Sequence, residues 1–145
     1  MNKAKLLSSS FILSAFLIFL DQIIKYLIRS FGGFYLCNPE IAWSIKIPTI
    51  AFWIIWIGII FFIVCLLGKN MTKAKPDKIL LLSLLLIFSG AIGNLIDRIT
   101  FGCVIDFIDL RIWPVFNLAD SFITIGAILI IIQKTMNKEQ GTIFF

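Results

Sequence analysis

The chain has 145 residues and a net charge of +5 at pH 7; 60% of its residues are apolar and its mean hydropathy is +1.03. A soluble domain is about 45–50% apolar, so this composition excludes an ordinary soluble protein and predicts one integral membrane domain over residues 1–145. There is no histidine, which excludes histidine-based triads and proton shuttles, and the three cysteines cannot make a zinc site, so we expect neither a metal nor another cofactor.

Four apolar stretches can cross a bilayer, whose ~30 Å hydrocarbon core needs about 20 apolar residues in a helix. They cover residues 7–28, 50–67, 79–99 and 117–132. The sequence therefore predicts an all-α membrane protein with four transmembrane helices. Residues 30–48 contain Gly32-Gly33 and Asn38-Pro39, which favours turns and short β elements at the membrane surface between the first two helices. Residues 100–114 form a second irregular stretch.

The first span carries two opposite charges, Asp21 and Lys25. They are four residues apart with the acid first, the better orientation for an intrahelical ion pair. Such a pair would lower the cost of both charges within the membrane. The alternative is that both residues contribute to a polar site shared with other helices.

The third span ends in a polar face. Five of its residues fall on one side of the helix by the i, i+3, i+4 rule: Gly90, Gly93, Asn94, Asp97 and Arg98. Charged side chains at membrane depth usually face a protein interior or a water-filled site. Two simpler interpretations stay open, in which the glycines serve helix packing and Arg98 reaches toward the membrane surface.

Two acids follow in apolar surroundings, Asp106 in the irregular stretch and Asp120 at the start of the fourth span. Two carboxylates brought within ~3 Å cannot both ionise, and such a pair can hydrolyse a peptide bond without histidine. The same pair could bind a proton or a cation in a transporter. Asp120 also suits the third position of a helix that Asn117 caps, so spacing alone leaves these interpretations open.

The three cysteines do not predict a disulfide. Their number is odd and no Cys-x-x-Cys spacing occurs. A bond between Cys37 and Cys103 would require both thiols to face an oxidising compartment, and the sequence does not favour it. Cys65 lies in the middle of the second span and is expected to behave as a small hydrophobe.

The charges divide unequally between the two sides of the membrane. Four spans place both termini on one side, which collects eight cations: Lys3, Lys5, Lys69, Lys73, Lys75, Lys78, Lys134 and Lys138. The other side has five: Lys25, Arg29, Lys46, Arg98 and Arg111. The positive-inside rule therefore predicts cytoplasmic termini and places the candidate site residues near the outer face. The sequence has no basic patch with interleaved aromatic residues, so nucleic-acid binding is not expected.

Five sequence blocks resemble those of the lipoprotein signal peptidase (signal peptidase II) family. In chain order they are Asp21-Gln22-x-x-Lys25, Asn38 with Ala42-Trp43, Gly90-x-x-Gly93-Asn94-x-x-Asp97-Arg98, Gly102-x-Val104-x-Asp106-Phe107-Ile108 and Pro114-Val115-Phe116-Asn117-x-Ala119-Asp120-Ser121. Together they extend over almost the whole chain. The resemblance also includes the family's length and its four-helix layout.

This resemblance implies an aspartic endopeptidase of the bacterial cytoplasmic (inner) membrane, with its active site near the outer face. It would remove the signal peptide from a prolipoprotein, cutting before a diacylglyceryl-modified cysteine. We further expect a monomer surrounded by membrane lipid. By position, Asp106 and Asp120 match the family's catalytic pair. The substrate-binding positions would be Asn38, Asn94, Arg98 and Asn117, and the supporting positions Asp21, Lys25 and Asp97.

Some positions depart from the family pattern. Glu40 stands where the family usually has glycine, which adds an acid to the first outer loop and removes backbone freedom. Ser89 and Trp43 are milder departures. Glu40 keeps open a paralogue that binds lipoproteins without cutting them. The other alternative is a small proton- or cation-coupled transporter that uses the same carboxylates.

Overall fold

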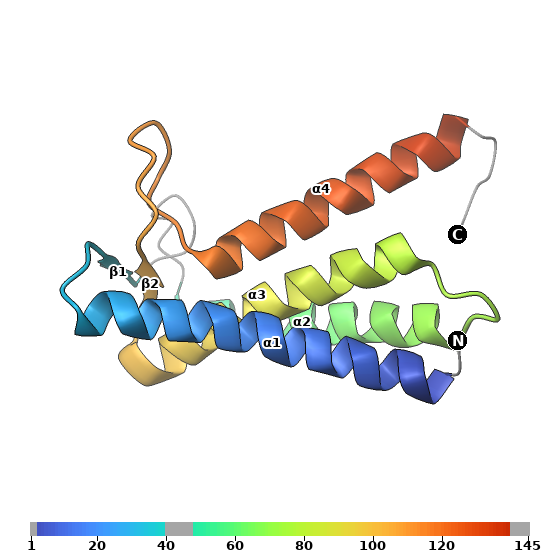
Figure 1. Ribbon diagram of the computed structural model, residues 1–145, viewed down its shortest axis with the longest axis horizontal. Helices are drawn as coiled ribbons and strands as arrows, with labels where there is room; N and C mark the ends of the chain where they lie inside the picture. The colour runs from blue at the N-terminus through green and yellow to red at the C-terminus, as the bar shows by residue number, and fades with distance from the viewer. Residues whose placement is uncertain (1–2, 40–47, 140–145) are drawn as a thin grey trace.

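Four long helices carry the chain back and forth between two ends of the molecule (Figure 1). The computed structural model describes residues 3–39 and 48–139; Glu40, Trp43 and Lys46 lie outside these ranges. The helices are α1 (Lys3–Ser30), α2 (Thr49–Thr72), α3 (Lys78–Phe101) and α4 (Leu118–Glu139). All four are long and apolar enough to cross a membrane, which confirms the predicted four-helix membrane fold.

The described ends of the chain lie at one end of the bundle. The first turns of α1, the last turns of α4 and the α2–α3 turn lie there. The described part of the α1–α2 connection, residues 31–39, and the α3–α4 connection lie at the opposite end (Figure 1). The candidate site residues belong to the end that holds these two connections.

α3 is the central helix, because the extensive contacts between helices all involve it, whereas α1 contacts α2 and α4 only slightly. Its small residues allow α4 to approach closely: a Cβ atom at Gly90 would lie 2.3 Å from the carbonyl oxygen of Ala119. A Cβ at Gly126 of α4 would lie 2.6 Å from the carbonyl oxygen of Ser83. The packing interpretation of Gly90 is therefore confirmed, and Gly126 does the same from the other helix.

A polar cluster fixes the α2–α3 turn. Asp77 caps α3, and its side chain accepts from the backbone N–H groups of residues 79 and 80, each at 3.0 Å. The buried Asn70 bonds both the N–H and the C=O of Asp77, at 3.0 and 2.8 Å, and Gln133 of α4 donates to the Asp77 carboxylate. α2 therefore continues through Asn70 to Thr72, past residue 67 where the apolar pattern ends.

A two-stranded antiparallel sheet joins the two connections. β1 (Leu36–Asn38) follows α1, and β2 (Val104–Asp106) follows α3; Asn38 pairs with Val104 and Leu36 with Asp106. The short strand predicted in residues 30–48 is present, but its partner comes from the α3–α4 connection, which showed no strand pattern. Three residues are too few for a period of two to be recognised.

A hairpin then returns the chain from β2 to α4. The backbone N–H groups of Phe107 and Ile108 donate to the carbonyl oxygen of Phe116, at 3.0 and 2.8 Å, and Phe116 N–H donates back to Ile108, at 3.1 Å. Because residues 107 and 116 meet in this way, Asp106 before the hairpin and Asn117 after it are close in space.

Candidate active site

Asn117 begins α4 and forms a reciprocal cap with Asp120. The Asn117 Oδ1 atom accepts from the Asp120 N–H at 2.9 Å, and Asp120 Oδ2 accepts from the Asn117 N–H at 3.2 Å. The capping interpretation is therefore confirmed. The cap uses only the Oδ2 atom of Asp120. The other carboxylate oxygen, Oδ1, accepts a 2.7 Å hydrogen bond from Nδ2 of Asn94 on α3.

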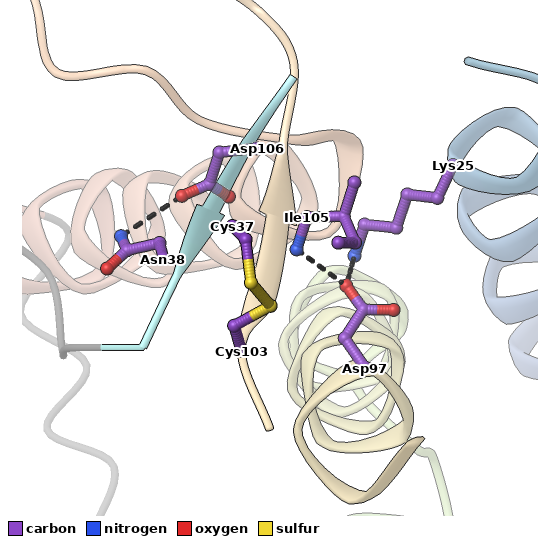
Figure 2. The surroundings of a disulfide bond; sticks show 7 residues. All are labelled: Lys25, Cys37, Asn38, Asp97, Cys103, Ile105 and Asp106. Atoms are coloured by element: carbon purple, nitrogen blue, oxygen red, sulfur yellow. Dashed lines mark hydrogen bonds and ion pairs between the residues drawn. A yellow bond between two sulfur atoms is a disulfide. The ribbon is translucent and has the colours of Figure 1, made fainter. Parts of the chain in front are cut away.

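Asp106, the last residue of β2, accepts amide hydrogen bonds on both of its carboxylate oxygens. Asn117 Nδ2 donates to Oδ1 at 2.7 Å, and Asn38 Nδ2 of β1 donates to Oδ2 at 3.1 Å (Figure 2). Asn117 Nδ2 also lies 3.1 Å from Asn94 Oδ1. Two asparagines thus connect Asp106 to Asp120 in one hydrogen-bond network.

The environment of Asp106 favours its protonated form. Its side chain is buried, and this desolvation raises the pKa of the Asp106 carboxyl above its ordinary value. The negative charge of Asp120 raises it further, while the hydrogen bonds from Asn38 and Asn117 act in the opposite direction. An acid of this kind can keep a proton that its neighbour has lost, as a pair of acids that share one proton requires.

A buried ion cluster lies beside this network. The expected Asp21–Lys25 pair is present, with Lys25 Nζ 2.8 Å from Asp21 Oδ2, and the same Nζ is 2.7 Å from Asp97 Oδ2 of α3. All three side chains are at most 2% exposed. Gly93 makes room for the cluster, because a Cβ there would lie 2.8 Å from Asp21 Oδ2.

The cluster contacts the neighbours of both candidate acids. Lys25 Nζ donates to Asn94 Oδ1 at 3.1 Å. Asp97 Oδ2 accepts from the N–H of Ile105, the residue before Asp106, at 3.1 Å (Figure 2). Asp21 Oδ1 accepts from the N–H of Ala119, the residue before Asp120, at 2.9 Å. A cluster that looked local in the sequence therefore fixes the backbone on both sides of the site.

Gln22 is a residue of this cluster that the sequence analysis did not select. Its Nε2 atom lies within 3.0–3.1 Å of three oxygens: Asp21 Oδ2, Asp97 Oδ1 and the carbonyl of Gly93. Asp21 and Asp97 share a single lysine, so an amide donor placed between the two acids reduces their mutual repulsion. The available signal was its place in the family block Asp21-Gln22-x-x-Lys25, to which the sequence analysis gave no role for the glutamine.

The polar network opens into a cavity of about 340 Å³. Its polar lining comes from Asn38, Asn94, Arg98, Asp106, Asp120 and Thr124, and its apolar lining from Val104, Trp113, Pro114, Val115, Phe116 and Ile123. The Arg98 guanidinium also lies 5.1 Å from the ring centre of Phe52 on α2. A cavity lined by apolar side chains together with convergent polar groups is typical of a ligand site. Within the described residues, no three of the acids and cysteines are grouped as metal ligands.

The structure places eight of the nine sequence-predicted site residues in two adjoining networks, and the ninth at the cavity. Asn38, Asn94, Asn117, Asp106 and Asp120 make up the network at the cavity, and Asp21, Lys25 and Asp97 make up the ion cluster. Arg98 lines the cavity. The amides of the three asparagines all donate to the two candidate acids, a role that spacing along the chain did not predict.

The sequence analysis was wrong about the cysteines. Cys37 and Cys103 form a disulfide, with their Cα atoms 5.4 Å apart (Figure 2). Antiparallel pairing of β1 and β2 brings together two residues that are 66 positions apart in the chain, and no local spacing could reveal this. Cys65 is a free thiol exposed on α2.

Comparison with known proteins gives consistent matches over nearly the whole chain. A family model described as Signal peptidase (SPase) II matches residues 13–136. The lipoprotein signal peptidase of Moorella thermoacetica is 39% identical over an alignment that covers 90% of this chain and 97% of that protein. The Staphylococcus aureus enzyme is 34% identical, with 97% and 98% covered. A bacterial membrane enzyme solved by the in meso method at 2.3 Å resolution superposes with a TM-score of 0.80 and 31% identity, covering 95% of this chain and 94% of that one.

Proposed function

The chain belongs to the signal peptidase II family, and we propose that Asp106 and Asp120 are the acids with which it removes signal peptides from prolipoproteins. The family consists of aspartic-type proteases, so the chain is a membrane aspartic endopeptidase. The transporter and the non-cleaving paralogue are not favoured.

One observation supports the assignment of Asp106 and Asp120 as the catalytic acids. Asp106 and Asp120 line the same cavity and are joined through Asn117 and Asn94. The other aspartates near this end of the bundle are engaged differently. Asp21 and Asp97 are paired with Lys25, and the exposed Asp109 accepts from the N–H of Arg111 at 2.7 Å. Among the acids in the described ranges, Asp106 and Asp120 are therefore the pair that we assign to catalysis on a peptide in the cavity.

The proposed reaction uses the pair in opposite protonation states. The ionised acid accepts a proton from water as the water oxygen attacks the scissile carbonyl carbon, while the protonated acid donates a hydrogen bond to the carbonyl oxygen. The tetrahedral intermediate collapses when the C–N bond breaks, and a carboxylic acid protonates the leaving amine. The pKa of Asp106 is raised by burial, which is the direction that a pair sharing one proton requires.

The remaining site residues position the reacting groups. Arg98 lines the cavity and has donors that suit peptide carbonyls, so we assign it to substrate binding. Asn38, Asn94 and Asn117 are assigned the same role, and their hydrogen bonds to the acids add a second one. Asp21, Lys25 and Asp97 are positioning residues, which act through the backbone of Ile105 and Ala119.

The cavity suits a substrate that is partly lipid. Its lining combines polar groups with apolar side chains from Ile123 of α4 and the hairpin residues Trp113 to Phe116. This arrangement supports a diacylglyceryl-modified cysteine as the residue after the cut, with surrounding bilayer lipid reaching the site. The distribution of lysines supports cytoplasmic termini and a site near the outer face of the bacterial cytoplasmic membrane. We further propose that residues 1–145 act as one domain and as a monomer.

The decisive experiment measures conversion of a diacylglyceryl-modified prolipoprotein by the purified protein in lipid. Asp106→Asn and Asp120→Asn should each abolish detectable turnover. Asp109→Asn is the matched control, because Asp109 lies in the same connection but is exposed, and it should keep wild-type turnover. Near wild-type turnover of either Asp106→Asn or Asp120→Asn would show that the acids are wrongly assigned.

Two further measurements test the substrate and the chemistry. The same prolipoprotein without its diacylglyceryl group should be cut far more slowly if the apolar side chains of the lining bind the acyl chains. A chelator should leave turnover unchanged, and loss of activity on its addition would contradict a mechanism that uses two carboxylates alone.

A further inference from the structure

The two faces of the β1–β2 pair carry different chemistry. Side chains alternate between the faces of a strand, so Asn38 lies on the same face as Val104 and Asp106, and Cys37 lies on the opposite face with Cys103 and Ile105. The first face bears the Asn38–Asp106 hydrogen bond and the second bears the disulfide (Figure 2). The disulfide therefore sits directly behind the contact between β1 and the candidate catalytic acid.

The two strands are held unequally. β2 is buried along its whole length, and Asp97 accepts from its Ile105 N–H. Leu36 and Cys37 of β1 are exposed and Asn38 is half-buried. A two-stranded pair of three residues each is marginal by itself, and a slip of one residue would turn Asn38 away from Asp106.

We propose that the Cys37–Cys103 disulfide is a positioning element of the active site, which keeps Asn38 on Asp106, and that its reduction lowers turnover. The inference rests on the proposed role of Asp106 in catalysis. The bond fixes the strand register covalently on the face opposite Asp106. Without it, Asn38 is held by a short exposed strand, and one of the two amide donors to Asp106 is no longer fixed.

The reaction that releases β1 is thiol–disulfide exchange with a dithiol. A thiolate of the dithiol attacks Sγ of the exposed Cys37, the S–S bond breaks, and the Cys103 thiolate leaves and takes up a proton. The second thiol of the reagent then displaces Cys37 from the mixed disulfide. The dithiol is oxidised to a disulfide by two electrons, and the protein gains two thiols.

The experiment compares oxidised and reduced forms of the same folded protein. It uses a Cys65→Ser background, in which the disulfide accounts for all remaining cysteines. Titration of thiols in denaturant should find none in the untreated protein and two after treatment with dithiothreitol. Reduction should lower kcat for the prolipoprotein by about tenfold or more, since small misplacements at an active site have effects of that size. Reoxidation should restore it.

A second comparison separates positioning from simple stabilisation. In an Asn38→Ala background, reduction should leave the remaining kcat unchanged, because the contact that the disulfide protects is already absent. A disulfide that only stabilises the fold would lower the unfolding temperature on reduction but would leave kcat unchanged well below that temperature in either background. That result would overturn the inference, as would an equal fall in kcat with and without Asn38.

These outcomes are distinct from failure of the proposed function. If Asp106→Asn is inactive but the oxidised and reduced proteins cut equally well, the inference is wrong and the assignment of Asp106 stands. If oxidised Asp106→Asn cuts normally, the assignment itself is wrong, whatever the effect of reduction.

Discussion

The amide of Asn117 lies 2.7 Å from the carboxylate of Asp106, measured from Nδ2 to Oδ1. The oxygen of the same amide accepts the N–H of Asp120 at 2.9 Å. One side chain therefore starts α4 and also connects the acid of β2 to the acid of α4. Structural capping and catalytic positioning are usually considered as alternatives, and here a single fully buried asparagine serves both.

Two substitutions of Asn117 should separate these roles. Serine is as good an N-cap as asparagine, whereas alanine provides no cap and costs about 1 kcal/mol of stability relative to serine. Alanine has no side-chain donor, and the serine hydroxyl is one bond too short to take the place of the Nδ2 atom that donates to Asp106. Asn117→Ser should therefore unfold at a higher temperature than Asn117→Ala, while both lose about tenfold to a hundredfold in kcat, the equivalent of leaving a buried acceptor without its donor. Wild-type kcat in Asn117→Ser would contradict the role of the amide donor.

The helices were predictable because their signals are local. Each span is a long apolar run, and the caps at Asp77 and Asn117 stand in the few residues before α3 and α4. The family blocks also marked the nine site residues. What sequence reasoning could not provide was their pairing. Asn38 approaches Asp106 across 68 residues and Ala119 approaches Asp21 across 98, and such contacts depend on how the helices pack.

The disulfide illustrates the same limit. An odd number of cysteines with no short spacing gave no reason to pair Cys37 with Cys103. The pairing follows from the register of two three-residue strands, which are too short to leave a pattern in the sequence. Lys25 was likewise expected to pair within its own helix. Its second partner, Asp97, lies on α3.

The titration of Asp106 should appear in the pH dependence of stability. Its pKa is raised in the folded protein by burial, so the folded state binds the proton more tightly than the unfolded chain does. This contribution is fully present below the unfolded pKa of about 3.9 and is lost as pH rises through the folded value. The wild-type unfolding temperature should therefore fall over that interval relative to that of Asp106→Asn, which cannot titrate. Asp109→Asn should behave as wild type, and equal slopes in wild type and Asp106→Asn would refute the prediction.

The ion cluster predicts an order of effects among its members. Lys25→Met leaves Asp21 and Asp97 buried without their cation and should cost about 3–5 kcal/mol. Asp97→Asn should cost less, about 1–3 kcal/mol, because Lys25 keeps Asp21 and the new amide oxygen can still accept from the Ile105 N–H. Chemical unfolding in lipid or detergent can rank them, with the exposed Lys75→Met as a neutral control. Equal losses, or the reverse order, would show that the cluster does not depend on its cation.

Close packing of α3 against α4 gives the last prediction. A methyl group at Gly90 would lie 2.3 Å from the carbonyl oxygen of Ala119, so α4 must shift next to Asp120. Gly90→Ala should therefore cost about 1–3 kcal/mol and lower kcat as well. Gly126→Ala meets the Ser83 carbonyl at 2.6 Å and should cost as much stability. It should affect kcat less, because residue 126 is about 9 Å farther along α4 from Asp120.

Gly58 of α2 provides the matched control for both substitutions, since a Cβ there has no atom within 4 Å. Gly58→Ala should be neutral, or stabilising by up to about 1 kcal/mol through helix propensity, with unchanged kcat. Thermal unfolding and prolipoprotein turnover of the three variants would test the argument together. If Gly90→Ala matched Gly58→Ala in both measurements, α3 and α4 would admit a methyl group at residue 90, and the prediction from close packing would be wrong. If Gly126→Ala reduced kcat as strongly as Gly90→Ala, the effect would arise from helix packing as a whole and not from displacement of Asp120.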